Sequence, residues 1–116
     1  MANYLLLQYG TMPPKTDEDL AKTLSDWATW FNELGENLVD GGSPLNFGGS
    51  IGKVAEGTDG SAGGRSGGYS SGYTIIKAAN LEGAREVAKG CPTAKKGGWI
   101  DVYAIYPVMT GGSKQP

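Results

Sequence analysis

The order of apolar and polar positions along the chain predicts core strands at three places. Asn3–Tyr9 (NYLLLQY) is a nearly continuous apolar run that ends at Gly10, and this pattern is typical of a central strand covered on both faces. Tyr73–Ile76 consists of aromatic and β-branched residues, which favour a pleated, half-buried surface. Trp99–Met109 is again rich in such residues, so it is predicted to be the last strand.

Capping residues and apolar spacing predict two helices between these strands. Thr16 precedes three acidic residues that match the positive end of a helix, so it caps a helix that stops at Gly35. Asn80 caps a second, shorter helix, which Gly90 and Pro92 terminate. The apolar stripe expected on the first helix recurs at steps of three and four residues and consists of Leu20, Leu24, Trp27, Ala28, Phe31 and Leu34.

The segment between the first helix and the strand at Tyr73–Ile76 is predicted to be extended and then irregular. An extended stretch begins at Leu38 and Val39, and Lys53–Glu56 alternates polar with apolar residues like an edge strand. Gly57–Gly72 is rich in glycine and serine and lacks an aliphatic anchor. Because it cannot bury enough surface to offset its ordering entropy, we expect it to be a mobile loop.

The resulting order β-α-β-β-α-β is the ferredoxin-like pattern, an α+β sandwich in which both helices cover one face of an antiparallel sheet. A chain of 116 residues is long enough for one such domain, here residues 1–110, followed by a polar tail at 111–116. The other face of the sheet needs a partner, which predicts a homodimer joined through the sheets. The strand residues whose apolar surface exceeds what two helices can hide are Leu5, Leu7, Ile75, Ile100 and Val102.

Composition and charge exclude several classes of protein. The formal net charge is −2 and the ten lysines and arginines are scattered, so no basic stripe is available to a nucleic acid. No run approaches the roughly eighteen apolar residues that span a membrane, and the lone Cys91 cannot form an internal disulfide, so we expect a cytoplasmic protein. Metal-ligand spacing and phosphate-loop spacing are both missing, so neither a metal nor a cofactor is predicted.

Several segments together resemble the YCII-related family, in its DGPF-like branch. They are LLLQYG, a tryptophan-bearing helix that ends in LG, LVDGGSPL, KVAEGTDG, GGYSSGYTIIKAANLEGAREVAKGCP and WIDVYAIYPVM, in that order, and they cover most of the chain. The resemblance implies a dimeric α/β barrel built from two ferredoxin-like subunits. A few members of the family resemble lyase or dehalogenating enzymes that act on small aromatic or carbonyl compounds.

The sequence departs from that family at two points. The run that usually reads acid-glycine-proline-phenylalanine appears here only as Asp59-Gly60-Ser61-Ala62, within a glycine-rich loop. Some relatives carry a helix histidine paired with an aspartate as an acid-base dyad, but this chain contains no histidine. Any general base would therefore be a carboxylate, a lysine or a tyrosine with a shifted pKa.

Two carboxylates are candidates for a functional site. Asp40 follows a predicted strand and could point under the first helix into a partly apolar cleft, where it would suit the role of catalytic base. The alternative is a turn, which the Asp-Gly pair strongly favours. Asp101 interrupts an apolar strand and is a binding candidate, although the alternation also suits a solvated or ion-paired residue on the other face.

Aromatic residues are candidates for the walls of a pocket. Trp27, Trp30 and Phe31 lie on neighbouring turns of the first helix, and Tyr73 lies on a strand that the helix would cover or flank. Because helices that face sheets commonly use such residues as core filling, Trp27 and Phe31 are expected in the core and Trp30 at a pocket border. Trp30, Trp27 and Tyr73 are the binding candidates of this group.

Two functions remain open at this level. The first is a lyase-type or isomerase-type enzyme with a cleft between helices and sheet, in which Asp40 is the base and tyrosine hydroxyls are donors. The second is a non-catalytic small-ligand-binding or regulatory dimer, which the lack of histidine and the glycine-diluted loop favour. A perturbed Asp40 in a closed cavity would support the enzyme, and an exposed Asp40 in a tight turn would support the binding protein.

Overall fold

The computed structural model describes residues 1–10, 14–46, 48–49 and 69–107. The edge strand expected at Lys53–Glu56, most of the loop expected at Gly57–Gly72 and the tail at 111–116 lie outside the described residues. The elements follow the predicted order and are β1 (Ala2–Tyr9), α1 (Asp17–Leu34), a 3-10 turn (Gly35–Asn37), β2 (Leu38–Asp40), β3 (Gly72–Ala78), α2 (Leu81–Ala88), α3 (Pro92–Lys95) and β4 (Trp99–Ile105).

The strands form one antiparallel sheet with the order β2-β3-β1-β4. β1 is central, and its Leu6 stands opposite Thr74 of β3 and Val102 of β4. β2 pairs with β3 at one edge, with a shift of register between Leu38 and Asp40. This strand order, together with the β-α-β-β-α-β sequence, confirms the ferredoxin-like α+β fold.

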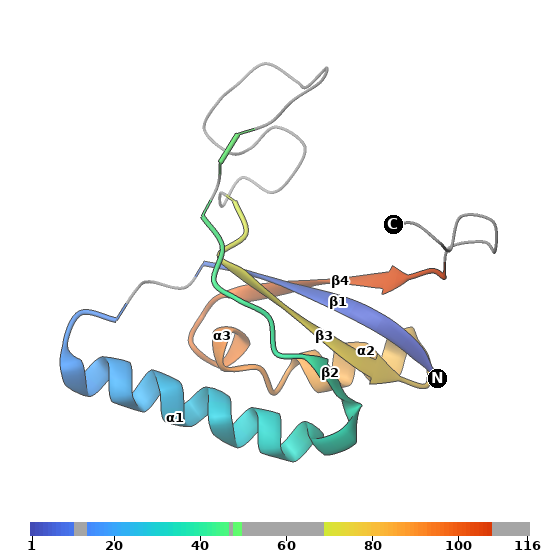
Figure 1. The fold of residues 1–116 in the computed structure, drawn as a ribbon, viewed down its shortest axis with the longest axis horizontal. Coiled ribbons are helices and arrows are strands. Elements are labelled where there is room, and N and C mark those ends of the chain that lie inside the picture. The colour runs from blue at the N-terminus through green and yellow to red at the C-terminus, as the bar shows by residue number, and fades with distance from the viewer. Residues whose placement is uncertain (11–13, 47, 50–68, 108–116) are drawn as a thin grey trace.

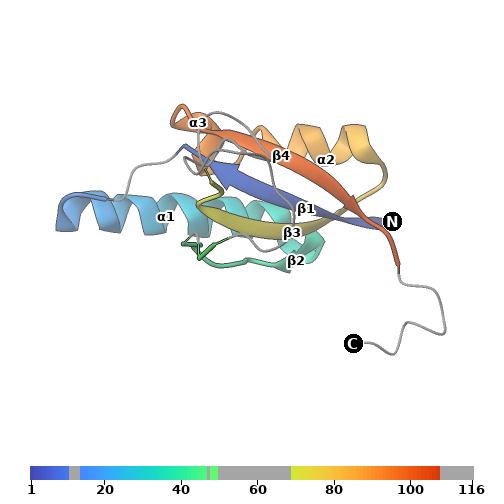
Figure 2. The ribbon, with the colours of Figure 1, turned by 90° about the horizontal axis from the view of Figure 1, so that it is seen from above.

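The α-helices that the structure describes lie on one face of the sheet, as the right-handed crossovers require (Figure 1). Seen from above, α2 is displaced along the axis of α1 toward the C-terminal end of α1, and the N-terminal end of α1 extends past the end of the sheet (Figure 2). The core lies between the two layers. Its buried apolar residues are Tyr4, Leu6, Trp30, Leu34, Ile76, Ala78, Ala84, Ala88 and Cys91.

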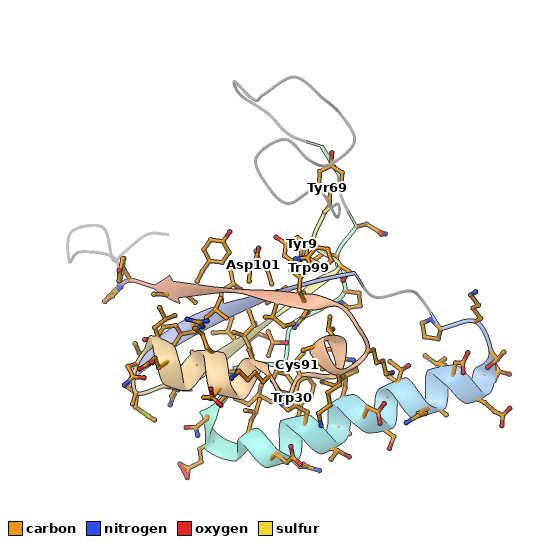
Figure 3. The ribbon with its side chains drawn as sticks, turned by 180° about the vertical axis from the view of Figure 1, so that it is seen from behind. Tyr9, Trp30, Tyr69, Cys91, Trp99 and Asp101 are labelled. Atoms are coloured by element: carbon orange, nitrogen blue, oxygen red, sulfur yellow. The ribbon has the colours of Figure 1, made fainter. Side chains whose placement is uncertain are left out.

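The opposite face of the sheet, called the open face below, carries the alternate residues of the strands. Tyr9 and Trp99 stack on it with ring centroids 5.6 Å apart and planes 4° from parallel. Figure 3 shows both rings, with Asp101, on the side of the sheet away from α1. The sequence predicts that Ile100 and Val102 add to the apolar surface of the uncovered face. They pack against the core instead, because β4 pairs them with the helix-facing residues of β1. The apolar residues of the open face are Leu5, Leu7, Tyr9, Tyr73, Ile75, Trp99, Tyr103 and Ile105.

Both predicted helix caps are present. Thr16 Oγ1 accepts a hydrogen bond from the Asp19 amide at 3.0 Å, and Asn80 Oδ1 accepts one from the Gly83 amide at 2.8 Å. Each bond satisfies an amide of the first turn that has no partner inside the helix. Within the described residues, no helix combines the length and the apolar character needed to cross a membrane.

Two boundaries differ from those expected. Pro92 follows the end of α2 as predicted, but it also opens α3, because a missing amide hydrogen costs nothing at the first position of a helix. β4 ends at Ile105, before Tyr106 and Pro107, whereas the sequence predicts a strand that continues to Met109. Pro107 lacks the backbone donor that a ladder needs.

Candidate functional site

A groove of about 670 Å³ lies between α1 and the end of the sheet where β1 stops and β3 begins. Its volume falls in the range typical of small-molecule sites. The walls come from α1 and from the segment that follows β2, and α3 closes one end. The large apolar residues that line it are Leu20, Leu24, Trp27, Phe31, Pro44 and Leu45.

The floor of the groove is polar and buried. Gln8 and Thr74 line it, yet they are only 4% and 0% exposed. Nε2 of Gln8 donates to Thr74 Oγ1 at 2.9 Å, and this hydroxyl donates to the Gly41 carbonyl at 3.2 Å. A Cβ at Gly72 would stand 2.7 Å from Gln8 Oε1, so glycine leaves the space that the glutamine side chain fills. Because buried polar groups are costly unless they are bonded, this line of hydrogen bonds holds the amide and the hydroxyl in fixed orientations.

The segment after β2 forms the second wall by crossing the start of β3. Asp40 Oδ1 accepts from the Gly42 amide at 2.8 Å, which fixes the turn. Gly42 has a φ of 80°, and a Cβ there would stand 1.6 Å from the Tyr73 carbonyl oxygen, so only glycine fits. The Leu45 amide then donates to the Ser71 carbonyl at 2.9 Å, which ties the wall to the strand below it.

Ser70 and Ser71 tie the start of β3 to the end of β1. The Ser71 amide and Ser70 Oγ both donate to the Gln8 carbonyl, at 2.7 and 3.0 Å. The sequence predicts a mobile loop through Gly72, but this described end of the segment is hydrogen-bonded and Gly72 already belongs to β3. A carbonyl at the end of a strand needs donors, and the two serines supply them.

The aromatic residues of α1 have exchanged the positions expected for them. Trp30 is 4% exposed and belongs to the core, not to the groove, and Figure 3 shows it in the layer between α1 and the sheet. Trp27 and Phe31 are half-buried and line the groove, with ring centroids 5.6 Å apart and planes tilted by 54°. The expectation that Trp30 borders a pocket while Trp27 and Phe31 fill the core is therefore corrected.

Trp30 packs against the turn after α2. A Cβ at Gly90 would stand 3.4 Å from Trp30 Nε1, so the indole packs directly against a residue without a side chain. α1 is rotated about its axis so that the bulkiest ring fills this space. Leu20 and Leu24, which the stripe places toward the core, are exposed, because the N-terminal half of α1 extends past the end of the sheet (Figure 2).

Lys96 supplies the charge of the groove. Its Nζ lies 3.4 Å from Asp26 Oδ2 on α1, and Lys22 Nζ lies 3.5 Å from the same oxygen. Two lysines thus share one carboxylate. Of the lining residues that the structure describes, Lys96 is the one with a formal charge at neutral pH.

The predicted carboxylates do not meet in the groove. Asp40 is exposed, is not part of the lining, and uses its carboxylate to hold the turn at Gly42. Asp101 is half-exposed and stands opposite Leu7, and it is one of the residues that line a separate hollow of about 410 Å³ between α2 and β4. Tyr73 is one of the residues that line the groove, although it stands opposite Leu7, whose side chain lies on the open face.

Cys91 is fully buried, and burial raises the pKa of its thiol. A buried thiol with a raised pKa packs as a small apolar group. In the part of the chain that the structure describes, no group of three or more His, Cys, Asp or Glu residues could hold a metal.

Sequence reasoning did not single out Gln8, Thr74 or Lys96. One signal for the first two was available, since Gln8 is the polar residue next to the end of an apolar strand and Thr74 interrupts an aromatic and aliphatic one. The hydrogen bond between Gln8 and Thr74 joins residues that are 66 positions apart in the sequence, so it can be found only once the strand register is known. Lys96 carries no signal, because it is one of two adjacent lysines in a short polar segment.

The chain is thus a ferredoxin-like α+β protein with a groove of small-molecule size between its helices and its sheet. No protein-family model matches the sequence, and no curated protein sequence matches it either. A solved structure with a similar fold is 5-chloro-2-hydroxyhydroquinone dehydrochlorinase (TftG) from Burkholderia phenoliruptrix AC1100, in complex with 2,5-dihydroxybenzoquinone. It is 14% identical with a TM-score of 0.48, and the match covers 86% of this chain and 89% of that chain. The fold assignment made above rests on strand order and not on this likeness.

Proposed function

We propose that the groove between α1 and the sheet binds a small planar organic molecule and that the chain functions as a small-ligand-binding protein. The observation that carries this proposal is the buried Gln8–Thr74 pair at the floor of an apolar groove. Apolar walls with a few fixed polar groups are the usual construction of a small-molecule site. The walls bind the body of the ligand, and the Gln8 amide, held by its bond to Thr74, orients one polar substituent.

The aromatic wall supports a planar ligand. Trp27 and Phe31 present half-buried rings that are tilted relative to one another, so a flat molecule can contact the face of one and the edge of the other. Such pairs of rings contribute about 0.5–1.5 kcal/mol beyond the area they bury. A flexible aliphatic chain would gain no such term and would lose more conformational entropy on binding.

A lyase or isomerase function with Asp40 as base has weaker support. A general base must come within hydrogen-bond reach of the proton that it removes, directly or through one water. Asp40 faces solvent and its carboxylate holds the Gly42 amide, which is the arrangement expected for a turn residue. Membership of the YCII-related family, in its DGPF-like branch, belongs to this proposal too and rests on the sequence segments quoted above.

We also propose that two copies of the chain associate through their open faces. The face carries Leu5, Leu7, Ile75 and a stacked aromatic pair, and an apolar patch of this kind is a common protein interface. Sedimentation at micromolar concentration should give the mass of two chains. Tyr103→Asp, on the open face, should dissociate them, whereas Leu81→Asp on α2 should not. A wild-type monomer at this concentration would contradict the dimer.

Binding is tested with 2-naphthol, a neutral planar probe with one hydroxyl, followed through the indole N–H signals of the three tryptophans. Trp27 lines the groove and Trp99 lies on the open face, so the Trp27 signal should shift saturably with probe concentration and the Trp99 signal should not. Trp→Phe variants assign the signals. A saturable shift at Trp99 alone, or none at any indole, would contradict the proposal.

A matched pair of substitutions locates the site independently. Leu24 and Leu81 are both exposed leucines on helices, but only Leu24 lines the groove. Leu24→Gln should weaken 2-naphthol binding severalfold, because it removes apolar surface from the wall. Leu81→Gln should leave the affinity unchanged, and equal losses in both variants would mean that the probe binds elsewhere.

A further inference from the structure

We infer that the natural ligand of this groove carries an anionic group, of carboxylate type, that binds to Lys96. The inference rests on the proposed function, because it names the class of ligand for the same groove. Of the described residues that line the groove, none is acidic, and Lys96 is the charged one. The electrostatic environment therefore favours an anion over a cation at the end of the groove near α3.

Lys96 is held in place before any ligand arrives. Its amide donates to the Pro92 and Thr93 carbonyls at 3.1 and 3.2 Å, and the Gly98 amide donates to the same Thr93 carbonyl at 3.0 Å. The backbone on both sides of the lysine is thus fixed. Asp26 contacts the other end of the side chain, at Nζ, so in the free protein the ammonium group already lies at the end of the groove near α3.

The shared carboxylate of Asp26 makes the lysine available to a ligand. Lys22 and Lys96 both contact Asp26 Oδ2, at 3.5 and 3.4 Å, and the three groups together carry one net positive charge. When an anionic group of the ligand binds Lys96 in place of Asp26, Asp26 keeps its contact with Lys22. The exchange therefore leaves no carboxylate without a cation, which removes the main cost of breaking an ion pair.

The groove then specifies where each part of the ligand lies. The planar body contacts Trp27 and Phe31, the anionic group reaches Lys96 at one end, and a polar substituent meets the Gln8 amide, which Thr74 holds in place, at the floor. An aromatic carboxylate with a ring hydroxyl has all three features. Half-exposed ion pairs are screened by salt, so affinity for such a ligand should fall as ionic strength rises.

The experiment compares 2-naphthoate with its neutral isostere 2-naphthamide by calorimetry on the wild type, Lys96→Gln, Lys96→Arg and Lys22→Gln. Lys22→Gln is the matched control, because it removes the same charge from the same carboxylate but lies outside the lining. Lys96→Gln should weaken 2-naphthoate binding about tenfold and change 2-naphthamide binding by less than about twofold. Lys96→Arg should keep most of the affinity. Lys22→Gln should weaken 2-naphthoate binding clearly less than Lys96→Gln does, because it only makes the release of Lys96 from Asp26 costlier, and it should leave 2-naphthamide binding unchanged.

Each other outcome has a distinct meaning. If both probes bind the wild type but Lys96→Gln weakens them equally or not at all, the inference is wrong while the proposed binding function stands. Equal losses of naphthoate affinity in Lys96→Gln and Lys22→Gln would mean that the anion responds to the overall positive charge of this surface and not to Lys96 in particular. This result would also overturn the inference. If neither probe binds the wild type by calorimetry and 2-naphthol does not shift the Trp27 signal, both the inference and the proposed function are wrong.

Discussion

The two halves of α1 carry the same kind of apolar spacing, yet they lie in different environments. In the C-terminal half, Trp30 and Leu34 are 4% and 8% exposed, whereas Leu20 and Leu24 in the N-terminal half are 46% and 61% exposed. The C-terminal half packs on the core, and the N-terminal half extends past the end of the sheet (Figure 2). An apolar stripe predicts that a helix has a buried face. How much of that face is buried depends on how far the sheet beneath the helix extends.

The difference separates stability from binding along one helix. The C-terminal half supplies core residues and one groove residue, Phe31. The N-terminal half and the central turn supply the rest of this groove wall through Leu20, Leu24 and Trp27. The exposed half is anchored to the rest of the molecule by the ion pair between Asp26 and Lys96. Substitutions in the two halves should therefore have effects of different size and different kind.

Trp30→Ala should give the largest effect. Removing a buried indole leaves a cavity against Gly90, and such substitutions cost about 3–5 kcal/mol of unfolding free energy, a large share of a small domain's stability. Phe31→Ala should cost clearly less, because Phe31 is half-buried at the groove. Urea denaturation of both variants measures the difference. A Phe31 loss equal to or larger than the Trp30 loss would contradict this view of the helix.

The sequence predicted best those features that depend on neighbouring residues. Thr16 and Asn80 cap helices through bonds to amides three residues away, so the local sequence contains both partners. The β-α-β-β-α-β order also follows, since each strand and each helix has its own period. The strand order of the sheet is then restricted by right-handed crossovers.

The rotation of α1 and the site itself could not be predicted, because both depend on contacts between distant segments. The stripe placed Trp27 and Phe31 toward the core, but Trp30 is buried there against Gly90, which lies far from it in the sequence. The polar floor needs Gln8 beside Thr74, which only the pairing of β1 with β3 provides. Asp40 illustrates the opposite case, since its Asp-Gly turn signal was local and the structure has that turn.

Thr16→Ala should give an intermediate effect that is confined to the exposed half. Loss of the cap costs about 1 kcal/mol, and the N-terminal half of α1 has little packing to compensate for it. Amide exchange in the first turns of α1 should speed up about fivefold, while exchange near Trp30 should change less. Asn80→Ala is the control, because it removes the equivalent bond from α2. Equal acceleration along all of α1 would mean that its two halves open as one unit.

Leu24→Ala should give the smallest effect, and it tests the comparison most directly when paired with Leu34→Ala. The two variants make the same chemical change on the same helix. Leu34 is buried, so its truncation should cost about 2–5 kcal/mol, whereas truncation at the exposed Leu24 should change the unfolding free energy by less than about 0.5 kcal/mol. Alanine's higher helix propensity partly offsets the small loss of apolar contact at Leu24. Denaturation midpoints without ligand measure both losses. If Leu24→Ala costs as much as Leu34→Ala, another surface covers the N-terminal half of α1 in the free protein, and the groove that this half borders would not be open to a ligand.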